Sequence, residues 1–282
     1  MLTPVLNRLK ARKDIALAVP SAWQRDREID GRFTILSMQQ EAQLCIYCGI
    51  RPAIENEHVI GNVFYIQRPK KAITVPSCSA CNRGRGDGGM RDLHLDEEYM
   101  RTILCMAEGC ENHPVVMALL EGNIARSFRR RHRGLRQRVL RSIQQTERLS
   151  TSGVFQPYSS PFVRPDFSRF QRVLRKITKG LYYHVLEKAL PSDYQVLVNP
   201  AIKPREVPIL IEKLHAKGDP SEFQAADEYD VFKFMFRIVN DSRTEWLMRF
   251  YDWAVFHSWT LPRNETAPGD TGMPMIHTSE II

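Results

Sequence analysis

The apolar positions along the chain follow two different periods, and each period predicts one kind of element. Between residues 167 and 190 they recur every three or four residues, as on one face of a helix. Asp166 is a suitable N-cap for this helix, and Pro191 stops it. The expected apolar face consists of Phe170, Leu174, Ile177, Leu181 and Val185.

Further along the chain the apolar positions alternate, as in a half-buried strand. Phe232, Phe234, Phe236 and Ile238 occupy every second position. A turn is expected at 240–242, and the returning strand alternates Trp246, Met248 and Phe250. We therefore predict an α+β domain with an antiparallel sheet over residues 160–262.

The other parts of the chain differ from this domain in composition. Residues 1–40 show no strong period and are expected to form helical and loop segments. Residues 41–112 hold a stretch rich in Gly, Pro, Cys and Asn, as in a small module stapled by a metal. Residues 113–150 are expected to form a basic helical connector, and the proline-containing segment 150–165 a link between domains. The polar tail 263–282 is expected to be disordered.

A further helical pattern covers residues 92–120, with an interruption at Pro114. Near its start lie the adjacent carboxylates Asp96, Glu97 and Glu98. Such a cluster ordinarily complements the positive end of the helix dipole. A role at a functional site is the alternative.

Positive charge is concentrated in one segment of the chain. The formal net charge is +8, and the nine arginines and single acid between Arg126 and Arg148 account for all of it. Leu135, Val139 and Ile143 are spaced as the apolar side of a helix that carries these charges outside. These arginines could simply form a solvated helix face. However, so many positive charges close together repel one another, which favours binding of a polyanionic partner. The expected phosphate-binding residues are Arg126, Arg129, Arg130, Arg131, Arg133 and Arg136.

The sequence also suggests where the protein resides. No stretch long enough to span a membrane is free of charge. The N-terminus has basic residues but no apolar core with a cleavage site, so we expect no secretory signal and a cytoplasmic protein. The six cysteines should then be reduced thiols.

Four of these cysteines form two C-x2-C pairs, Cys45 with Cys48 and Cys78 with Cys81. Each pair places two thiolates on one tight turn, and two such turns supply the four sulfurs of a closed, structural Zn²⁺ site. A chance grouping of four thiols is the alternative. Cys105 and Cys110 are better explained as core residues than as a second metal site.

Candidate catalytic residues lie between and beside the two cysteine pairs. Glu57 and His58 are adjacent in the intervening segment, and Asn82 follows Cys81 directly. A carboxylate and an amide are oxygen ligands suited to one Mg²⁺ or Mn²⁺, and a neutral histidine can take a proton from an attacking water. This set suggests a ββα-metal nuclease site.

The motifs CIYCG, EHVIG and ITVPSCSACNRG together resemble the HNH endonuclease family, in the branch with paired zinc-binding cysteines. The resemblance implies a zinc-stapled ββα-metal module, followed here by the basic helix. The segments KITKGLYYH and WLMRFYDWAVF are similar to a bacterial subgroup of that family, which implies a C-terminal α+β domain. The family resemblance implies a metal ligand at Glu57, the general base at His58 and a second metal ligand at Asn82. It also implies cleavage of nucleic acid, usually double-stranded DNA, with one catalytic divalent ion.

Three alternatives remain open on the sequence. One is a zinc-stapled nucleic-acid-binding protein without cleavage, favoured by the lack of the family's middle asparagine near Ile73 or Thr74. A backbone carbonyl at that point could orient His58 instead. Another is a nuclease directed at RNA. In the third, the C-terminal domain is a protein-interaction module that keeps the nuclease inactive until a regulatory protein partner binds. This domain could also mediate assembly of a homo-oligomer.

Overall fold

A computed structural model describes residues 43–82, 92–107, 109–129, 134–146, 160–202, 207–240 and 243–265 of the chain. All of these lie in one compact unit, 41–282. The predicted N-terminal region 1–40 and residues 266–282 of the predicted tail lie outside the described residues.

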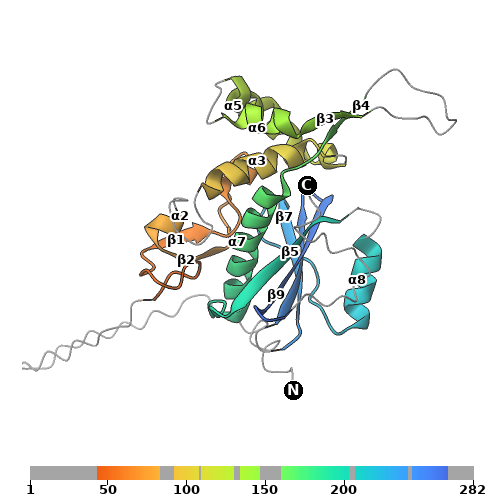
Figure 1. The fold of residues 1–282 in the computed structure, drawn as a ribbon. Coiled ribbons are helices and arrows are strands. Elements are labelled where there is room, and N and C mark those ends of the chain that lie inside the picture. The colour runs from red at the N-terminus through yellow and green to blue at the C-terminus, as the bar shows by residue number, and fades with distance from the viewer. Residues whose placement is uncertain are drawn as a thin grey trace, which may run out of the picture. The chain divides into compact units, whose positions relative to one another are not determined.

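The first half of the described chain is mostly helical, and the second half carries the main sheet (Figure 1). The first elements are β1 (Glu55–His58), β2 (Thr74–Ser77), α2 (Ser79–Asn82), α3 (Leu93–Cys105), α4 (Pro114–Leu119), α5 (Ala125–Arg129), α6 (Leu135–Ser142) and β3 (Ile143–Thr146). The later elements are β4 (Ser160–Val163), α7 (Phe167–Leu186), β5 (Tyr194–Ile202), α8 (Val207–Ala216), β6 (Gln224–Ala225), β7 (Phe232–Ile238), β8 (Thr244–Phe250) and β9 (Ala254–Pro262).

The main sheet has five strands in the order β5-β9-β8-β7-β6, with every neighbouring pair antiparallel. The predicted α+β class and antiparallel sheet are confirmed, and β7 and β8 pair from Phe232–Phe250 to Ile238–Thr244. Both faces of the sheet are covered. One face packs in the core that contains α7, and the other packs Met235, Leu247 and Val255 against Leu210 and Leu214 of α8.

Helix α7 begins and packs as its sequence predicts. The backbone amide of Ser168 donates to Oδ1 of the N-cap Asp166 at 3.2 Å. Phe170, Leu174, Ile177 and Leu181 are all buried. In Figure 1, α7 lies between the β1–β2 hairpin and the main sheet, and one continuous core contains residues from Cys45 to Phe256. The predicted nuclease module and the predicted C-terminal domain therefore share a core.

Close packing of α7 on the hairpin depends on a glycine. A Cβ atom added at Gly180 would lie 2.7 Å from Cγ2 of Val59, the residue after β1. Real Cβ atoms do not approach carbon so closely, so a larger side chain would push α7 away from the hairpin.

We expect Gly180→Ala to lower the free energy of unfolding by about 1–2 kcal/mol, because overpacking outweighs the better helix propensity of alanine. Gly122→Ala is the matched control, since a Cβ there would meet no atom within 4 Å. Urea unfolding of the two variants measures the difference. Equal stability of the two variants would contradict the packing argument.

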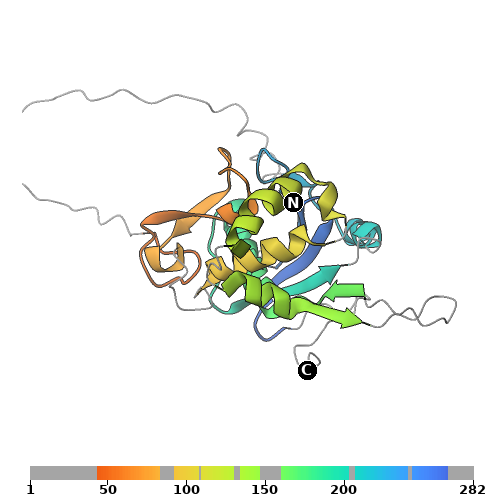
Figure 2. The same ribbon diagram turned by 90° about the horizontal axis from the view of Figure 1, so that it is seen from above.

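The arginine-rich segment differs from the single helix expected from its sequence. It forms the short helices α5 and α6, with residues 130–133 outside the described part. Leu135 and Val139 are buried as predicted. The prediction for Ile143 was wrong, because this residue begins β3 and pairs with Val163 of β4. Long-range strand pairing overrides the local helical period here, and β3 and β4 form a separate two-stranded sheet (Figure 2).

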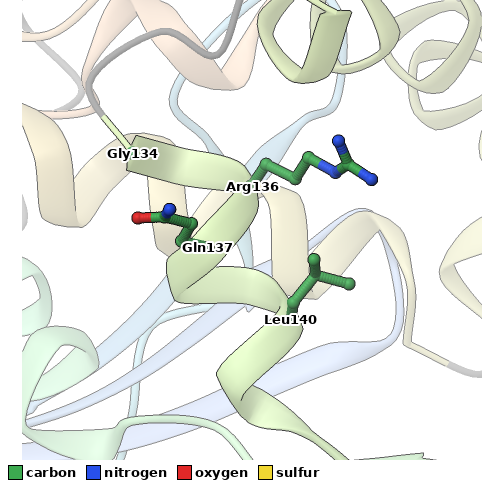
Figure 3. A pocket seen from close by; sticks show the side chains of 4 residues that line it. All are labelled: Gly134, Arg136, Gln137 and Leu140. Atoms are coloured by element: carbon green, nitrogen blue, oxygen red, sulfur yellow. The ribbon is translucent and has the colours of Figure 1, made fainter.

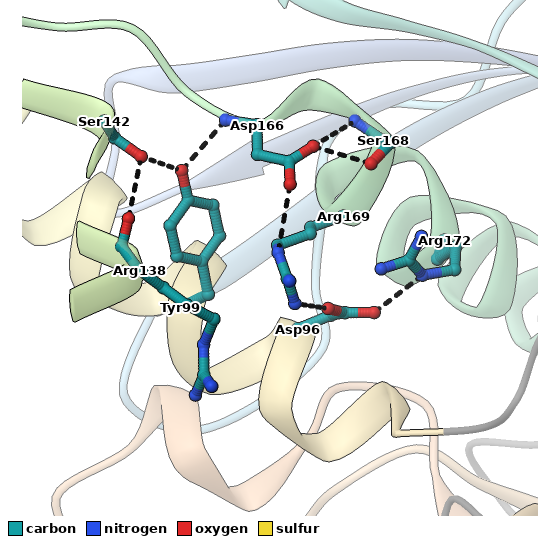
Figure 4. A network of polar contacts seen from close by, with 8 residues as sticks. All are labelled: Asp96, Tyr99, Arg138, Ser142, Asp166, Ser168, Arg169 and Arg172. Carbon is teal, nitrogen blue, oxygen red and sulfur yellow. Dashed lines mark hydrogen bonds and ion pairs between the residues drawn. The ribbon is translucent and has the colours of Figure 1, made fainter. Parts of the chain in front are cut away.

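A polar network joins α3, α6 and α7 (Figure 4). The backbone amide of Asp166 donates to the hydroxyl of Tyr99 at 2.9 Å, and the same hydroxyl is hydrogen-bonded to Ser142. Asp96, 1% exposed, accepts from Arg169 at 2.5 Å and from Arg172 at 2.7 Å. Asp96 is therefore a buried ion-pair partner that fixes α3 against α7, and the expected dipole role does not explain its position.

Within the described residues, no helix is both long enough and apolar enough to cross a lipid bilayer.

Candidate metal centre and active site

The four cysteines of the two C-x2-C pairs lie together. The sulfurs of Cys45, Cys48, Cys78 and Cys81 all lie within 4.8 Å of one another. Sulfurs around a tetrahedral Zn²⁺ at about 2.3 Å are about 3.8 Å apart, so a small contraction brings this set to the geometry of a zinc site. Among the described residues, this is the one group of three or more Cys, His, Asp or Glu side chains close enough to hold a metal.

Backbone hydrogen bonds hold the two cysteine turns in place. The first turn closes through the amide of Gly49, which donates to the carbonyl of Cys45 at 2.8 Å. Gly49 has φ +65°, a left-handed conformation that suits glycine. In the second turn the amide of Cys81 donates to Sγ of Cys78 at 3.4 Å. The amide of Ile46 donates to the carbonyl of Pro76 and joins the two turns.

The thiols are crowded enough to perturb one another. The hydrogen bond with Cys81 lowers the pKa of Cys45 to about 3, against the opposing effect of burial. The same hydrogen bond raises the pKa of Cys81 above its ordinary value, and burial adds to this. Cys81 is thus the protonated partner of a Cys45 thiolate, where a Zn²⁺ would displace the proton and hold both sulfurs as thiolates. The donor set therefore fits a structural zinc.

The hairpin places the candidate catalytic residues on opposite faces of β1. Side chains alternate along a strand, so Glu55 and Glu57 share one face and His58 points to the other. The structure gives Glu57, His58 and Asn82 three separate partners.

Glu57 forms an ion pair that the sequence does not predict. Its Oε1 lies 2.5 Å from Nζ of Lys176, a residue of α7, and the same Nζ lies 2.8 Å from Oε1 of Glu97 on α3. Burial raises the pKa of Glu57, while Lys176 opposes the shift. Burial disfavours the charged form of Lys176, but Glu97 and Glu57 together raise its pKa above the ordinary value. The lysine is therefore charged.

Asn82 contacts the other carboxylate of the same strand face. Its Nδ2 donates to Oε2 of Glu55 at 2.5 Å. With the amide nitrogen used in this way, Oδ1 of Asn82 is its remaining group that can bind a cation. Glu55 is a functional candidate that the sequence reasoning missed, although its spacing of two residues from Glu57 is a signal for it.

His58 lies against an arginine. Its Nε2 is 2.7 Å from Nη2 of the exposed Arg68. A guanidinium group can only donate, so Nε2 is the acceptor and the imidazole is neutral. Burial lowers the pKa of His58, with further lowering by Arg68 and Lys176, which keeps the ring neutral at pH 7.

Among the described residues, no backbone carbonyl orients His58 as the middle asparagine of an HNH motif would. The carbonyl of Ile73 accepts from the amide of Val59 at 3.0 Å. Nδ1 of His58 is buried and has no hydrogen-bond partner among the described residues. The expectation that a carbonyl near Ile73 orients His58 is therefore wrong for the chain as described.

The described part of the arginine-rich segment is exposed. Arg126, Arg129 and Arg136 are exposed side chains, whereas Arg130, Arg131 and Arg133 lie outside the described residues. Arg136 lines a surface pocket of about 550 Å³ on α6, together with Gly134, Gln137 and Leu140 (Figure 3). Exposed arginines are free to meet an anionic partner, so the predicted phosphate contacts stay a prediction.

Comparisons with known proteins add no relatives. No family model matches the sequence, and neither the curated proteins nor the solved structures contain a significant match.

Proposed function

We propose that the chain is a metal-dependent endonuclease of the HNH type that hydrolyses phosphodiester bonds in nucleic acid, with DNA as the substrate. The observation that carries the proposal is the order strand, strand, helix from Glu55 to Asn82, with four clustered cysteines at its base. A neutral histidine at the end of the first strand is the group that such chemistry needs.

In this proposal His58 is the general base. Its Nε2 carries the lone pair that would accept a proton from water once Arg68, which donates to that lone pair in the structure, turns to the substrate phosphate. Arg68, within hydrogen-bond distance of that nitrogen, is a group that binds phosphate well. A phosphodiester held by Arg68 would therefore lie close to the imidazole, where the attacking water is needed.

Glu57 and Asn82 would hold a Mg²⁺ or Mn²⁺ ion. Oε2 of Glu57 and Oδ1 of Asn82 are the oxygens of these side chains that the contacts with Lys176 and Glu55 do not use. Hard divalent cations prefer oxygen ligands of this kind and retain several waters. When bound, the ion would polarise the phosphodiester and stabilise the leaving oxygen.

The arginine-rich segment would supply affinity without sequence preference. Arginines bind the phosphates of the nucleic-acid backbone, and such contacts position a duplex without reading its bases. The local charge of this segment supports a polyanionic substrate.

A plasmid assay tests the proposal. Supercoiled plasmid incubated with the protein and Mg²⁺ or Mn²⁺ should be nicked, and EDTA added after zinc loading should stop the reaction. A structured RNA tested in parallel distinguishes a nuclease that prefers RNA. A gel shift without nicking at any metal concentration would favour the alternative of a binding protein without cleavage, which the missing middle asparagine supports.

A further inference from the structure

Lys176 is buried on the apolar side of α7. It is 3% exposed, and its neighbours one helical turn away on α7 are the buried Val173 and Gly180. A lysine is almost never fully buried unless it is paired. Its two partners come from different elements, Glu57 from β1 and Glu97 from α3. Lys176 thus joins the helix between the hairpin and the sheet to the candidate metal ligand.

Two glycines allow the backbone to pack closely around Lys176, Glu57 and Glu97. A Cβ at Gly61 would lie 2.4 Å from Oε2 of Glu97, so the chain just after β1 packs directly on that carboxylate. Gly180 lets α7 approach Val59 in the same way, one turn beyond Lys176. Two close approaches at glycines therefore fix the positions of the lysine and both carboxylates.

The charges of this cluster do not cancel. With both carboxylates ionised, Glu57 and Glu97 contribute two negative charges and Lys176 one positive charge, so the three groups together have a net charge of −1. Without Lys176 the net charge would be −2, next to the oxygen proposed to bind a divalent cation. A buried ammonium so close to a metal ligand repels a second cation strongly, because the protein interior screens charges less than water does.

We propose that Lys176 is a positioning residue of the metal site, which holds Oε1 of Glu57 and weakens the binding of the divalent ion through its charge. The proposal rests on the proposed function, since it assumes that Glu57 is a ligand of that ion. It means that α7 contributes a residue to the proposed nuclease site.

A series of charge variants tests this inference through Mn²⁺ binding to the zinc-loaded full chain, measured by the loss of the free Mn²⁺ signal in electron paramagnetic resonance. Lys176→Met keeps the length of the side chain and changes the net charge from −1 to −2. Glu97→Gln changes it to zero. The double variant Lys176→Met/Glu97→Gln restores −1 and is the matched control.

The affinity for Mn²⁺ should follow the charge of the cluster. We expect Lys176→Met to bind on the order of tenfold more tightly than wild type, and Glu97→Gln on the order of tenfold more weakly. The double variant should bind within about threefold of wild type, by the same argument. Zinc content and thermal unfolding report whether each variant is folded. If Lys176→Met does not fold, the double variant should still bind more tightly than Glu97→Gln.

The possible failures are distinguishable. Wild type that binds no Mn²⁺ would contradict the proposed metal site itself. A different result would overturn only the role of Lys176. In that case wild type binds Mn²⁺ and nicks plasmid, but either all variants have the same affinity for Mn²⁺ or Lys176→Met binds it more weakly than wild type.

Discussion

Cys78→Ser is expected to remove the bound zinc and to unfold the β1–β2 hairpin. Cys78 is 3% exposed and lies at the junction of β2 and α2, where its Sγ accepts a hydrogen bond from the amide of Cys81. Structural zinc contributes roughly 10–16 kcal/mol of binding free energy to small domains. This is comparable to or larger than the free energy of unfolding of a typical domain, about 5–15 kcal/mol. Since the hairpin shares a core with α7, the loss should lower the stability of the whole described unit.

Zinc content by mass spectrometry and thermal unfolding together measure this effect. Wild type should carry one zinc per chain and Cys78→Ser none. Cys105→Ser is the matched control, because Cys105 is 1% exposed but lies outside the cluster of four. It should retain zinc and lose only the modest stability expected for a polar substitution in a core. A Cys78→Ser protein with a full complement of zinc would show that the cluster is not the metal site.

His58→Ala is expected to slow plasmid nicking by about 10²–10⁴-fold, the contribution that a positioned general base makes. The protein should remain folded, since His58 is half-buried and its described hydrogen bond is to the exposed Arg68. Binding of plasmid in a gel shift should be almost unchanged, because the arginines that would bind phosphate are retained. The variant should therefore lose the proposed hydrolysis and retain the proposed binding of plasmid.

A second histidine variant separates loss of the base from a general effect of losing an imidazole. His215→Ala changes an exposed residue of α8, on the opposite face of the main sheet from α7. It should cut at the wild-type rate. If His58→Ala also cuts at that rate, with zinc content and melting unchanged, the assignment of the base is wrong.

The sequence alone predicted those parts of the molecule that depend on neighbours along the chain. The spacing of the cysteine pairs predicted the cluster of four thiols that is close enough to hold a metal, because a C-x2-C turn presents both sulfurs whatever surrounds it. The helical period and N-cap predicted α7, and the alternation of apolar residues predicted β7 and β8. In each case the element predicted from the local sequence pattern is the one that the tertiary structure contains.

Predictions from local sequence patterns were wrong where a residue has a partner far away in the chain. Ile143 continues the period of an amphipathic helix, but its pairing with Val163 places it in a strand. Asp96 and Glu97 read as carboxylates that complement a helix dipole, yet both are buried and paired with basic residues of α7. A long-range partner outweighed the local preference at both places.

The sequence by itself therefore determined the cluster of four cysteines that could hold a metal, the helix α7 and the antiparallel sheet. It also supplied Glu57, His58 and Asn82 as candidate site residues. Only the tertiary structure decided which charges surround these candidates. Lys176 reaches Glu57 across 119 positions of the chain, and no local pattern signals such a contact. The physical reason is that a buried ion pair depends on which elements pack together, and packing brings together residues that are far apart in the sequence.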